Sequence, residues 1–271
     1  VEIINNSKYE SFKEVIKILD KILSLFLKQD FIFVFTDPII FENKRIIRYE
    51  NLNIAKSDND RLSTRFFYNT QDLIRESLIW KLICKKSIWD IAHNYLGDNF
   101  CLQAIHSWSL IPPSKKFLRE SDKLKNNFFS YQAQSFHYDL DWPRFLKFFI
   151  CINEAVKDSG PFEYAIGTNN FKNKYLFGDK RIEKKQLDNY EIKYLIGPPG
   201  TYAAADTIGF HRDGRPQKNE RTVLQLEFSS SRIGSPVTRT EIDKKYLSEK
   251  SISFLKKIND FYPRSLRAII K

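Results

Sequence analysis

The sequence predicts a mainly β protein with helical additions, whose core is expected to be a β-sandwich or a jelly roll. From about residue 100 onward, the chain is a series of short segments rich in β-branched and aromatic residues, several of which alternate apolar and polar positions. Gly, Pro, Asn or Asp stands at most of their junctions. Helical periodicity dominates the first hundred residues and returns in the tail.

The N-terminal third is expected to support the core with helices. Residues 11–28 place their apolar side chains on one helical face. Residues 71–86 and 87–97 show the same periodicity, and Gly97 is expected to end the second of these helices. The segment FIFVF at 31–35 predicts one short buried strand.

The core is expected to consist of seven strand segments, at 99–111, 134–139, 144–153, 161–167, 190–197, 200–207 and 221–229. Between the first two lies a long polar segment, 112–130, which predicts a mobile flap. The tail at 246–265 predicts a helix ended by Pro263.

Length and composition indicate one packed domain. The chain has 271 residues, of which 42% are hydrophobic and 15% aromatic, so it can bury a sizeable core and is not a disordered chain. We expect a single domain, 1–271, with a mainly helical buttress at 1–99, a jelly-roll core at 100–232 and a C-terminal helical extension at 233–271.

Charge and cysteine content restrict the class of protein further. The formal net charge of +11 favours anionic partners, but the lysines are scattered instead of forming one basic stripe, which disfavours nucleic-acid binding. Three cysteines without close spacing predict neither a disulfide framework nor a zinc cluster, and so indicate a cytoplasmic location. No apolar run approaches the roughly 20 residues that a membrane span needs.

His137 and Asp139 form the motif with the clearest chemistry. In a strand, residues two apart point to the same face, so both side chains can reach one metal ion. His211, just after one predicted strand and before another, is the candidate third ligand. Two imidazoles and one carboxylate suit iron(II) and leave positions open for a chelating cosubstrate and dioxygen. The alternatives are that Asp139 caps a turn with Asp141 and that His211 lies exposed in a loop.

Arg221 follows His211 by ten residues, at the start of a predicted strand. A guanidinium group can bind a carboxylate through two parallel hydrogen bonds. A dicarboxylate such as 2-oxoglutarate would need such a partner at its distal end. Arg221 is therefore the candidate cosubstrate-binding residue.

Two blocks of the chain resemble the phytanoyl-CoA dioxygenase family of iron(II)- and 2-oxoglutarate-dependent oxygenases. They are FHYDLDWPRFLKFFICINEAVKDSGPFEYAIGTN and GPPGTYAAADTIGFHRDGRPQKNERTVLQLEFS, and the resemblance covers about residues 100–232. It implies a double-stranded β-helix, that is, a cupin-like jelly roll. It also implies that His137, Asp139 and His211 bind iron, and that Arg221 binds the distal carboxylate of 2-oxoglutarate.

The same resemblance implies hydroxylation of a small or carrier-borne organic substrate by dioxygen, with release of succinate and CO2. Asp139 favours hydroxylation over halogenation, because related halogenating enzymes have a small residue at the position of this carboxylate. The chain departs from the family pattern at residues 167–169, Gly-Thr-Asn, where the family often has His. The net charge would allow an anionic substrate.

Two alternatives from other classes remain at this point. A cupin-like protein could bind a metal without oxygenase activity, and a basic module could bind a polyanion. Other residues carry weaker signals and are not assigned to the candidate site. The side chain of Lys147 points either into the barrel or out to solvent. His106 is expected to be a hydrogen-bonded core histidine, with a place in the cavity lining as the alternative. Gln134 is expected to be an ordinary strand residue, with a contact to the cosubstrate as the alternative, and Asp206 either orients a ligand or makes a turn.

Overall fold

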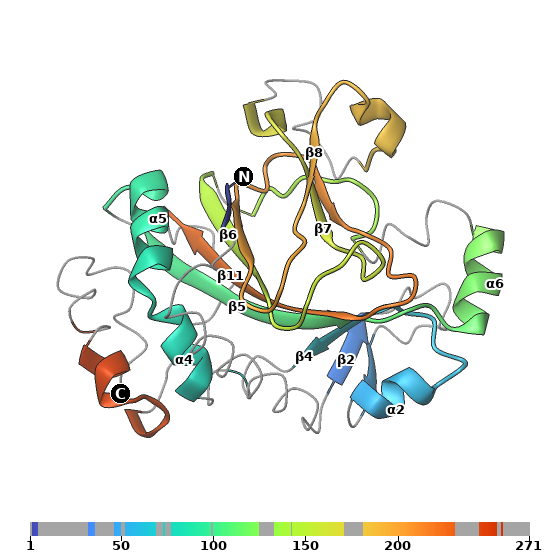
Figure 1. Ribbon diagram of the computed structural model, residues 1–271, viewed down its shortest axis with the longest axis horizontal. Coiled ribbons are helices and arrows are strands. Elements are labelled where there is room, and N and C mark those ends of the chain that lie inside the picture. Colours follow the sequence, from blue (N-terminus) through green and yellow to red (C-terminus); the bar gives the residue numbers. More distant parts are fainter. Residues whose placement is uncertain are drawn as a thin grey trace.

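The computed structural model describes residues 2–4, 32–35, 46–49, 52–68, 73, 77–98, 100–124, 133–141, 143–170, 181–230, 244–253 and 256 (Figure 1). The predicted helix at 11–28 lies outside these residues. Of the predicted tail helix at 246–265, residues 246–253 and 256 are described, and of these 249–253 and 256 are α-helical. Within the described ranges, no helix is long and apolar enough to cross a membrane.

A large antiparallel sheet forms the base of the molecule. Its strand order is β1 (Glu2–Ile4), β9 (Tyr202–Ala205), β6 (Phe145–Cys151), β11 (Arg221–Ser229), β5 (Cys101–Leu110), β4 (Arg65–Tyr68), β2 (Ile32–Phe35) and β3 (Ile46–Tyr49). A second antiparallel sheet has the order β10 (His211–Asp213), β7 (Phe162–Ala165), β8 (Ile192–Tyr194). In Figure 1, β7 and β8 lie above the long strands β5 and β11.

The path of the chain between these sheets identifies a jelly roll. From β5 the chain passes to the bridge between His137 and His211 in β10, then to β6 in the large sheet, and then to β7 and β8 in the small sheet. It returns to the large sheet with β9, crosses to β10 and ends the core with β11. Each sheet thus contains strands from both halves of the core, which is the double-stranded β-helix arrangement. The predicted fold class is confirmed.

Six of the seven predicted core strands are present, as β5, β6, β7, β8, β9 and β11. The seventh prediction, a strand at 134–139, is wrong, because this segment makes only isolated bridges at Phe136 and His137. The physical reason is a change of register. After His137 pairs with His211, the Asp139 N–H bonds to the carbonyl of Thr207, which lies within the turn formed by the hydrogen bond from the Gly209 N–H to the Asp206 carbonyl.

The first part of the predicted flap at 112–130 forms a helix, while the mobility of this segment stays a prediction. Helix α6 (Lys115–Leu124) begins after Ser114, whose hydroxyl accepts the Phe117 N–H at 3.0 Å as an N-cap. Phe117 is buried against the body of the protein. Residues 125–130 lie outside the described residues.

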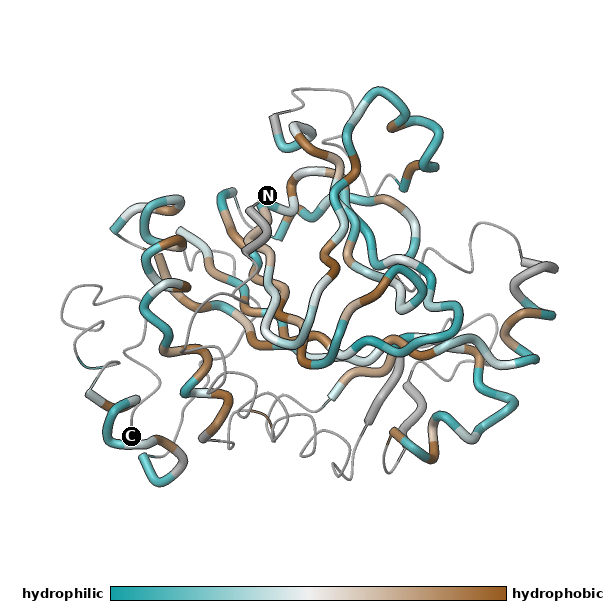
Figure 2. Tube along the Cα trace, in the orientation of Figure 1, coloured by the Kyte–Doolittle hydropathy of each residue, from teal (hydrophilic) through white to brown (hydrophobic). Residues whose placement is uncertain are grey.

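The N-terminal region supplies strands as well as helices. The described helices there are α2 (Leu52–Ser57), α4 (Ser77–Ile83) and α5 (Lys86–Leu96), and β1 to β4 extend the large sheet at its edges. As predicted, α5 ends at Gly97, which has a positive φ of 83° and donates its N–H to the His93 carbonyl. Brown and teal alternate along α4 and α5 in Figure 2, as expected of helices with one buried face.

The core has two main apolar layers. One lies between α4, α5 and the large sheet, where Trp89 packs against Phe100 and edge-on against Phe228, with ring centroids 5.6 and 5.3 Å apart. The other lies between the two sheets and includes Trp108 and Phe162. The helices therefore hold the outer face of the large sheet, while its inner face is available for a site.

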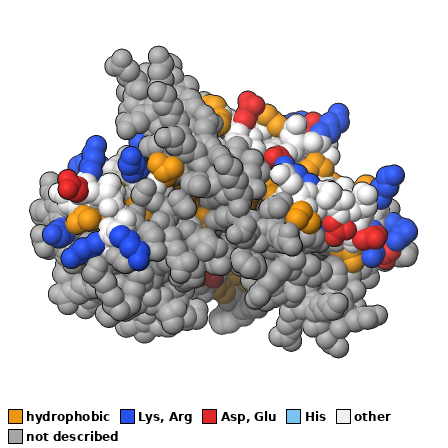
Figure 3. Space-filling view, turned by 90° about the horizontal axis from the view of Figure 1, so that it is seen from below, with side chains coloured by type: hydrophobic (Ala, Val, Ile, Leu, Met, Phe, Trp, Pro, Cys, Tyr) orange, Lys and Arg blue, Asp and Glu red, His pale blue; other side chains and the backbone are white. Residues whose placement is uncertain are grey.

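On the described part of the face seen in Figure 3, Lys and Arg side chains gather in separate groups, with Asp and Glu among them. This agrees with the scattered basic charge seen in the sequence.

Substituting Trp89→Ala is expected to lower the free energy of unfolding by about 3–5 kcal/mol, because it removes a buried ring from the layer beneath the large sheet. Chemical denaturation measures this change. Ile196→Ala, at an exposed position, is the control and is expected to change it by less than about 0.5 kcal/mol. Equal effects of the two substitutions would contradict the packing described here.

Candidate metal centre

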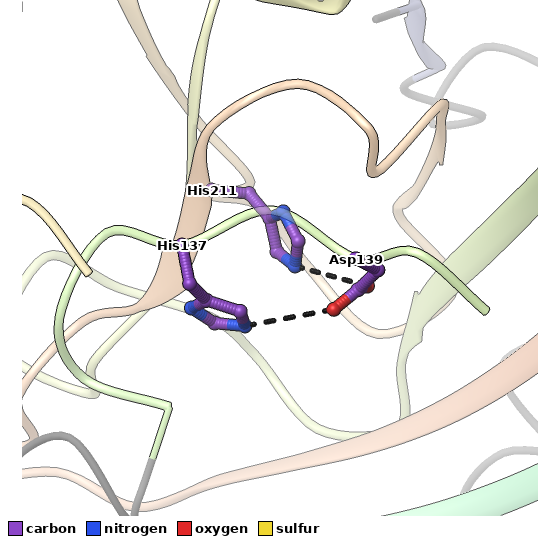
Figure 4. Close-up of side chains that lie close together, drawn as sticks. All are labelled: His137, Asp139 and His211. Carbon is purple, nitrogen blue, oxygen red and sulfur yellow. Dashed lines mark ion pairs between the residues drawn. The ribbon is translucent and has the colours of Figure 1, made fainter. Parts of the chain in front are cut away.

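His137, Asp139 and His211 converge on one point of the interior (Figure 4). Each offers one ligand atom, and these atoms all lie within 4.8 Å of one another. His137 donates its backbone N–H to the His211 carbonyl at 2.9 Å and accepts the His211 N–H at 2.8 Å. Because residues paired in this way project to the same side, the two imidazole rings lie 4.4 Å apart between centroids.

Asp139 completes the cluster from the chain segment that follows His137. Its backbone N–H bonds to the Thr207 carbonyl at 2.8 Å, which places the carboxylate beside both rings. Its Oδ1 lies 3.9 Å from Nε2 of His137, and its Oδ2 lies 3.4 Å from Nε2 of His211. The structure thus brings together the three residues that the sequence motif singled out.

Backbone carbonyl groups orient both imidazole rings. Nδ1 of His137 lies 2.9 Å from the Ser135 carbonyl, and Nδ1 of His211 lies 3.0 Å from the Gly209 carbonyl. A carbonyl oxygen only accepts, so in each ring the proton sits on Nδ1 and the lone pair on Nε2. Both lone pairs consequently face Asp139, which is the arrangement that a metal ligand needs.

The ionisation states also suit metal binding. Burial, together with the neighbouring His211, lowers the pKa of His137 from 6.5 to about 3, so this imidazole is neutral near pH 7. Burial alone would raise the pKa of Asp139, but His211 and the ammonium of Lys147 hold it well below its usual range. A neutral imidazole and a carboxylate are the forms that coordinate metals.

Lys147 points inward from β6 and contacts this cluster, which settles the direction that the sequence left open. Its buried ammonium lies 2.8 Å from Oδ2 of Asp139 and 2.6 Å from Oδ2 of Asp141. Glu227, opposite Lys147 on β11, lies 3.4 Å away. Burial by itself would lower the pKa of Lys147, but Asp139, Glu227 and Asp141 together raise it above its ordinary value.

Arg221 lies in the same interior, at the start of β11. It is fully buried and donates from Nη2 to Oδ1 of Asp213 at 2.5 Å. Asp213 stands two residues after His211 on β10, so the two side chains share one face of that strand. Nε and Nη1 of Arg221 are buried and have no hydrogen-bond partner among the described residues.

Arg65 is a functional candidate that the sequence did not reveal. It pairs with Leu110 on β5, as Arg221 does from the other side, so both guanidinium groups lie on the inner face of the large sheet. It lies over the rings of Trp108 and Phe67, 4.2 and 4.7 Å from their centroids. Its Nε is 3.7 Å from Oδ2 of Asp213. A single Arg in a short strand carries no motif, so only the fold shows its place.

Gln134 and Asp206 have structural contacts. Gln134 is buried and donates to the Thr64 hydroxyl at 2.7 Å, as expected of a structural residue. Asp206 makes a turn by accepting the Ile208 N–H at 3.1 Å. His106 is accessible to solvent, so the expectation of a core histidine is wrong. It nevertheless shares the inner face of β5 with Trp108, where burial together with the cations of Lys147 and Arg65 lowers its pKa. Residues 168–170 form a short 3-10 helix in which the Thr168 hydroxyl accepts the Phe210 N–H.

A cavity of about 1230 Å³ lies outside the small sheet and does not include the three clustered residues. Its walls contain Arg212 and Glu163, which form an ion pair at 2.9 Å. Arg212 alternates with His211 and Asp213 along β10, so it points to the opposite face. The cavity is therefore separate from the candidate metal centre.

No protein-family model matches the sequence, and no curated protein matches it. The resemblance to the phytanoyl-CoA dioxygenase family therefore stays a prediction.

Among solved structures, the chain is similar to AviO1 from Streptomyces viridochromogenes Tue57, at 13% identity, covering 83% of this chain and 87% of that one, with a TM-score of 0.46. It is similar to EctD from S. alaskensis, solved with 2-oxoglutarate and 5-hydroxyectoine, at 14% identity, 84% and 71% coverage and a TM-score of 0.49. It is also similar to HygX from Streptomyces hygroscopicus, solved with nickel, 2-oxoglutarate and hygromycin B bound, at 10% identity, 81% and 89% coverage and a TM-score of 0.42.

The metal-free protein is expected to lose stability as the pH falls from 7 to 5. The unfolded chain takes up a proton at His137 near pH 6.5, whereas the folded protein does so only near pH 3. In this range the unfolded state binds more protons, so the free energy of unfolding rises with pH. Through His137 alone, the free energy of unfolding is expected to be about 2 kcal/mol lower at pH 5 than at pH 7.

His137→Asn is expected to remove this contribution. Denaturation curves of both proteins at pH 7 and 5, in a buffer with a chelator, measure the difference. An equal loss in the wild type and the variant would show that His137 is not held neutral by burial.

Proposed function

We propose that this protein is an iron(II)- and 2-oxoglutarate-dependent dioxygenase that hydroxylates a small or carrier-borne organic substrate and releases succinate and CO2. One observation carries the proposal: a cluster of two imidazoles and one carboxylate lies on the same inner face as a buried arginine with unsatisfied donors. The sequence resemblance to the phytanoyl-CoA dioxygenase family points to the same activity.

The charge around the cluster fits a divalent cation. Asp139, Asp141 and Glu227 bring three carboxylates to the ammonium of Lys147, and of these Asp141 is exposed to solvent. The carboxylate of Asp139, beside the Nε2 atoms of His137 and His211, favours a metal dication. Two His and one carboxylate on one face form the arrangement typical of non-haem iron(II) oxygenases. We therefore assign His137, Asp139 and His211 as the iron ligands.

The charge around Arg221 fits a carboxylate ligand. Arg221 and Arg65 share the single carboxylate of Asp213, which leaves an excess of one positive charge in a buried region. A buried donor without a partner costs about 1–3 kcal/mol, so Nε and Nη1 of Arg221 favour an added acceptor. Because Asp213 and His211 share one face of β10, a dicarboxylate held by Arg221 would extend toward the ligand cluster. Arg221 is thus assigned to the distal carboxylate of 2-oxoglutarate, with Arg65 beside it.

When bound, iron and 2-oxoglutarate supply the activation of dioxygen and the oxidation of a C–H bond. The chain's own residues prepare the place for this chemistry. Trp108, Phe149 and Phe162 line the layer between the sheets with apolar surface, which excludes water from the inner face. Asp139 occupies the position where related halogenating enzymes lack a carboxylate, so hydroxylation is the assigned outcome.

Location and domain organisation belong to the same proposal. Cys84, Cys101 and Cys151 are all free, which is consistent with a reducing cytoplasm. We treat residues 1–271 as one oxygenase domain. Its substrate is a small molecule, for which the net charge of +11 would allow an anionic group.

Anaerobic addition of iron(II) and then 2-oxoglutarate to the wild-type protein is the experiment that tests the function. A weak visible absorption band that needs both additions is expected, because 2-oxoglutarate would chelate the bound iron. A protein that binds the metal but gives no band would instead be a cupin-like metal protein without oxygenase activity. Salt-sensitive binding of polyanions without metal dependence would point to a basic binding module.

Asp139→Ala is expected to abolish the succinate release that depends on iron and 2-oxoglutarate, because it removes one of three ligands. Mass spectrometry or a coupled assay measures succinate. Asp158→Ala, in the wall of the outer cavity, is the matched control and is expected to retain the wild-type rate. Wild-type succinate release from the Asp139 variant would refute the assigned site.

Arg221→Gln is expected to raise the 2-oxoglutarate concentration needed for half-maximal rate by about 10- to 100-fold. This corresponds to the loss of about 1.4–2.7 kcal/mol, as expected for one charged hydrogen-bonded pair. The affinity for iron should stay within about threefold, since Arg221 is not a ligand. Arg215→Gln, at an exposed position, is the control. A large loss of metal affinity with an unchanged 2-oxoglutarate requirement would contradict the assignment.

A further inference from the structure

Lys147 makes more contacts with the candidate metal centre than any assigned role explains. Its ammonium has three N–H donors, and three carboxylates surround it: Asp139 at 2.8 Å, Asp141 at 2.6 Å and Glu227 at 3.4 Å. The side chains of Lys147 and Glu227 are each only 8% exposed. The ammonium is thus committed to acidic partners, one of which is a proposed metal ligand.

The sheet holds this ammonium in place. Lys147 lies in the middle of β6, which is paired on both sides, with Ala205 of β9 on one flank and Glu227 of β11 on the other. Every residue of β6 is buried. Because two neighbouring strands fix the backbone and Glu227 stands directly opposite, the lysine has little freedom to follow a moving carboxylate.

The contact discriminates between the two oxygens of Asp139. Oδ2 accepts the hydrogen bond from Lys147 at 2.8 Å and lies 3.4 Å from Nε2 of His211, whereas Oδ1 lies 3.9 Å from Nε2 of His137. A metal dication and an ammonium on the same oxygen repel each other. We propose that Lys147 is a positioning residue that holds Oδ2 of Asp139 and thereby makes this carboxylate a one-oxygen ligand through Oδ1.

This role has a consequence for the proposed reaction. A carboxylate that bound through both oxygens would occupy one more coordination position. A one-oxygen Asp139 leaves that position for the cosubstrate or dioxygen, so Lys147 would keep the centre open. The inference rests on the proposed metal centre but not on 2-oxoglutarate turnover.

A purely electrostatic role and a positioning role of Lys147 predict opposite changes in metal affinity when its ammonium is removed. If Lys147 acted only as a nearby positive charge, its loss would make the site more negative and tighten the binding of a cation. If it positions Asp139, its loss frees the carboxylate, and residues that orient metal ligands typically contribute 10- to 100-fold to affinity. The sign of the change therefore decides between the two roles.

Cobalt(II) titration without 2-oxoglutarate tests the proposal, with affinity and the visible d–d spectrum as readouts. Lys147→Met is expected to weaken cobalt binding by about 10- to 100-fold and to change the spectrum, because Asp139 can then bind through both oxygens. The double variant Lys147→Met/Glu227→Gln removes one charge of each sign and should remain weak. Wild-type or tighter affinity with a wild-type spectrum in Lys147→Met would overturn the proposal.

Lys147→Arg covers the case in which Lys147→Met does not fold, which circular dichroism would reveal. It keeps the charge but moves the donors, so a positioning role predicts binding at least about threefold weaker and an altered spectrum. Wild-type binding and spectrum in this variant would refute that role. A wild type that binds cobalt but forms no succinate would refute the oxygenase function alone, whereas a wild type that binds no cobalt would refute the metal centre itself.

Discussion

The reciprocal backbone hydrogen bonds between His137 and His211 are the interaction on which the candidate site depends. They join the segment before β6 to the short strand β10, two parts of the chain that are distant in sequence. This single bridge brings both imidazoles to one side and leaves Asp139 next to them. The carbonyls that orient the two rings lie two residues before each histidine, so the same local geometry that forms the bridge also directs the Nε2 lone pairs.

Buried charge is divided between two neighbouring groups of opposite sign. Around Lys147, the carboxylates of Asp139 and Glu227 face one buried ammonium, which the exposed Asp141 also contacts, and around Asp213 two guanidinium groups face one carboxylate. Unpaired charge in a low-dielectric interior is costly, so each group favours a ligand of the opposite sign. His211 and Asp213 lie on the same face of β10 and connect them. A metal cation next to a carboxylate ligand satisfies both groups at once, which is the physical basis of the proposed function.

Much of the fold was readable from local patterns. Six core strands follow from β-branched and aromatic segments punctuated by turn residues, and the end of α5 follows from Gly97. The failures have physical causes. The segment at 134–139 has the composition of a strand, but the turn before His211 shifts its partner's register. The polar segment after β5 forms α6 because Ser114 caps it and Phe117 anchors it, which a reading based on polarity missed.

The sequence by itself determined which side chains could form the site, because the His-x-Asp spacing, the later His and the Arg ten residues beyond it are visible in the order of the residues. It also determined the alternation of strand and turn that builds a jelly roll. Only the tertiary structure decided that His211 is buried beside His137, that Lys147 points inward, and that Arg65 joins Arg221. The reason is that a strand's periodicity specifies which residues share a face, whereas the identity of the facing strand depends on pairing between distant segments.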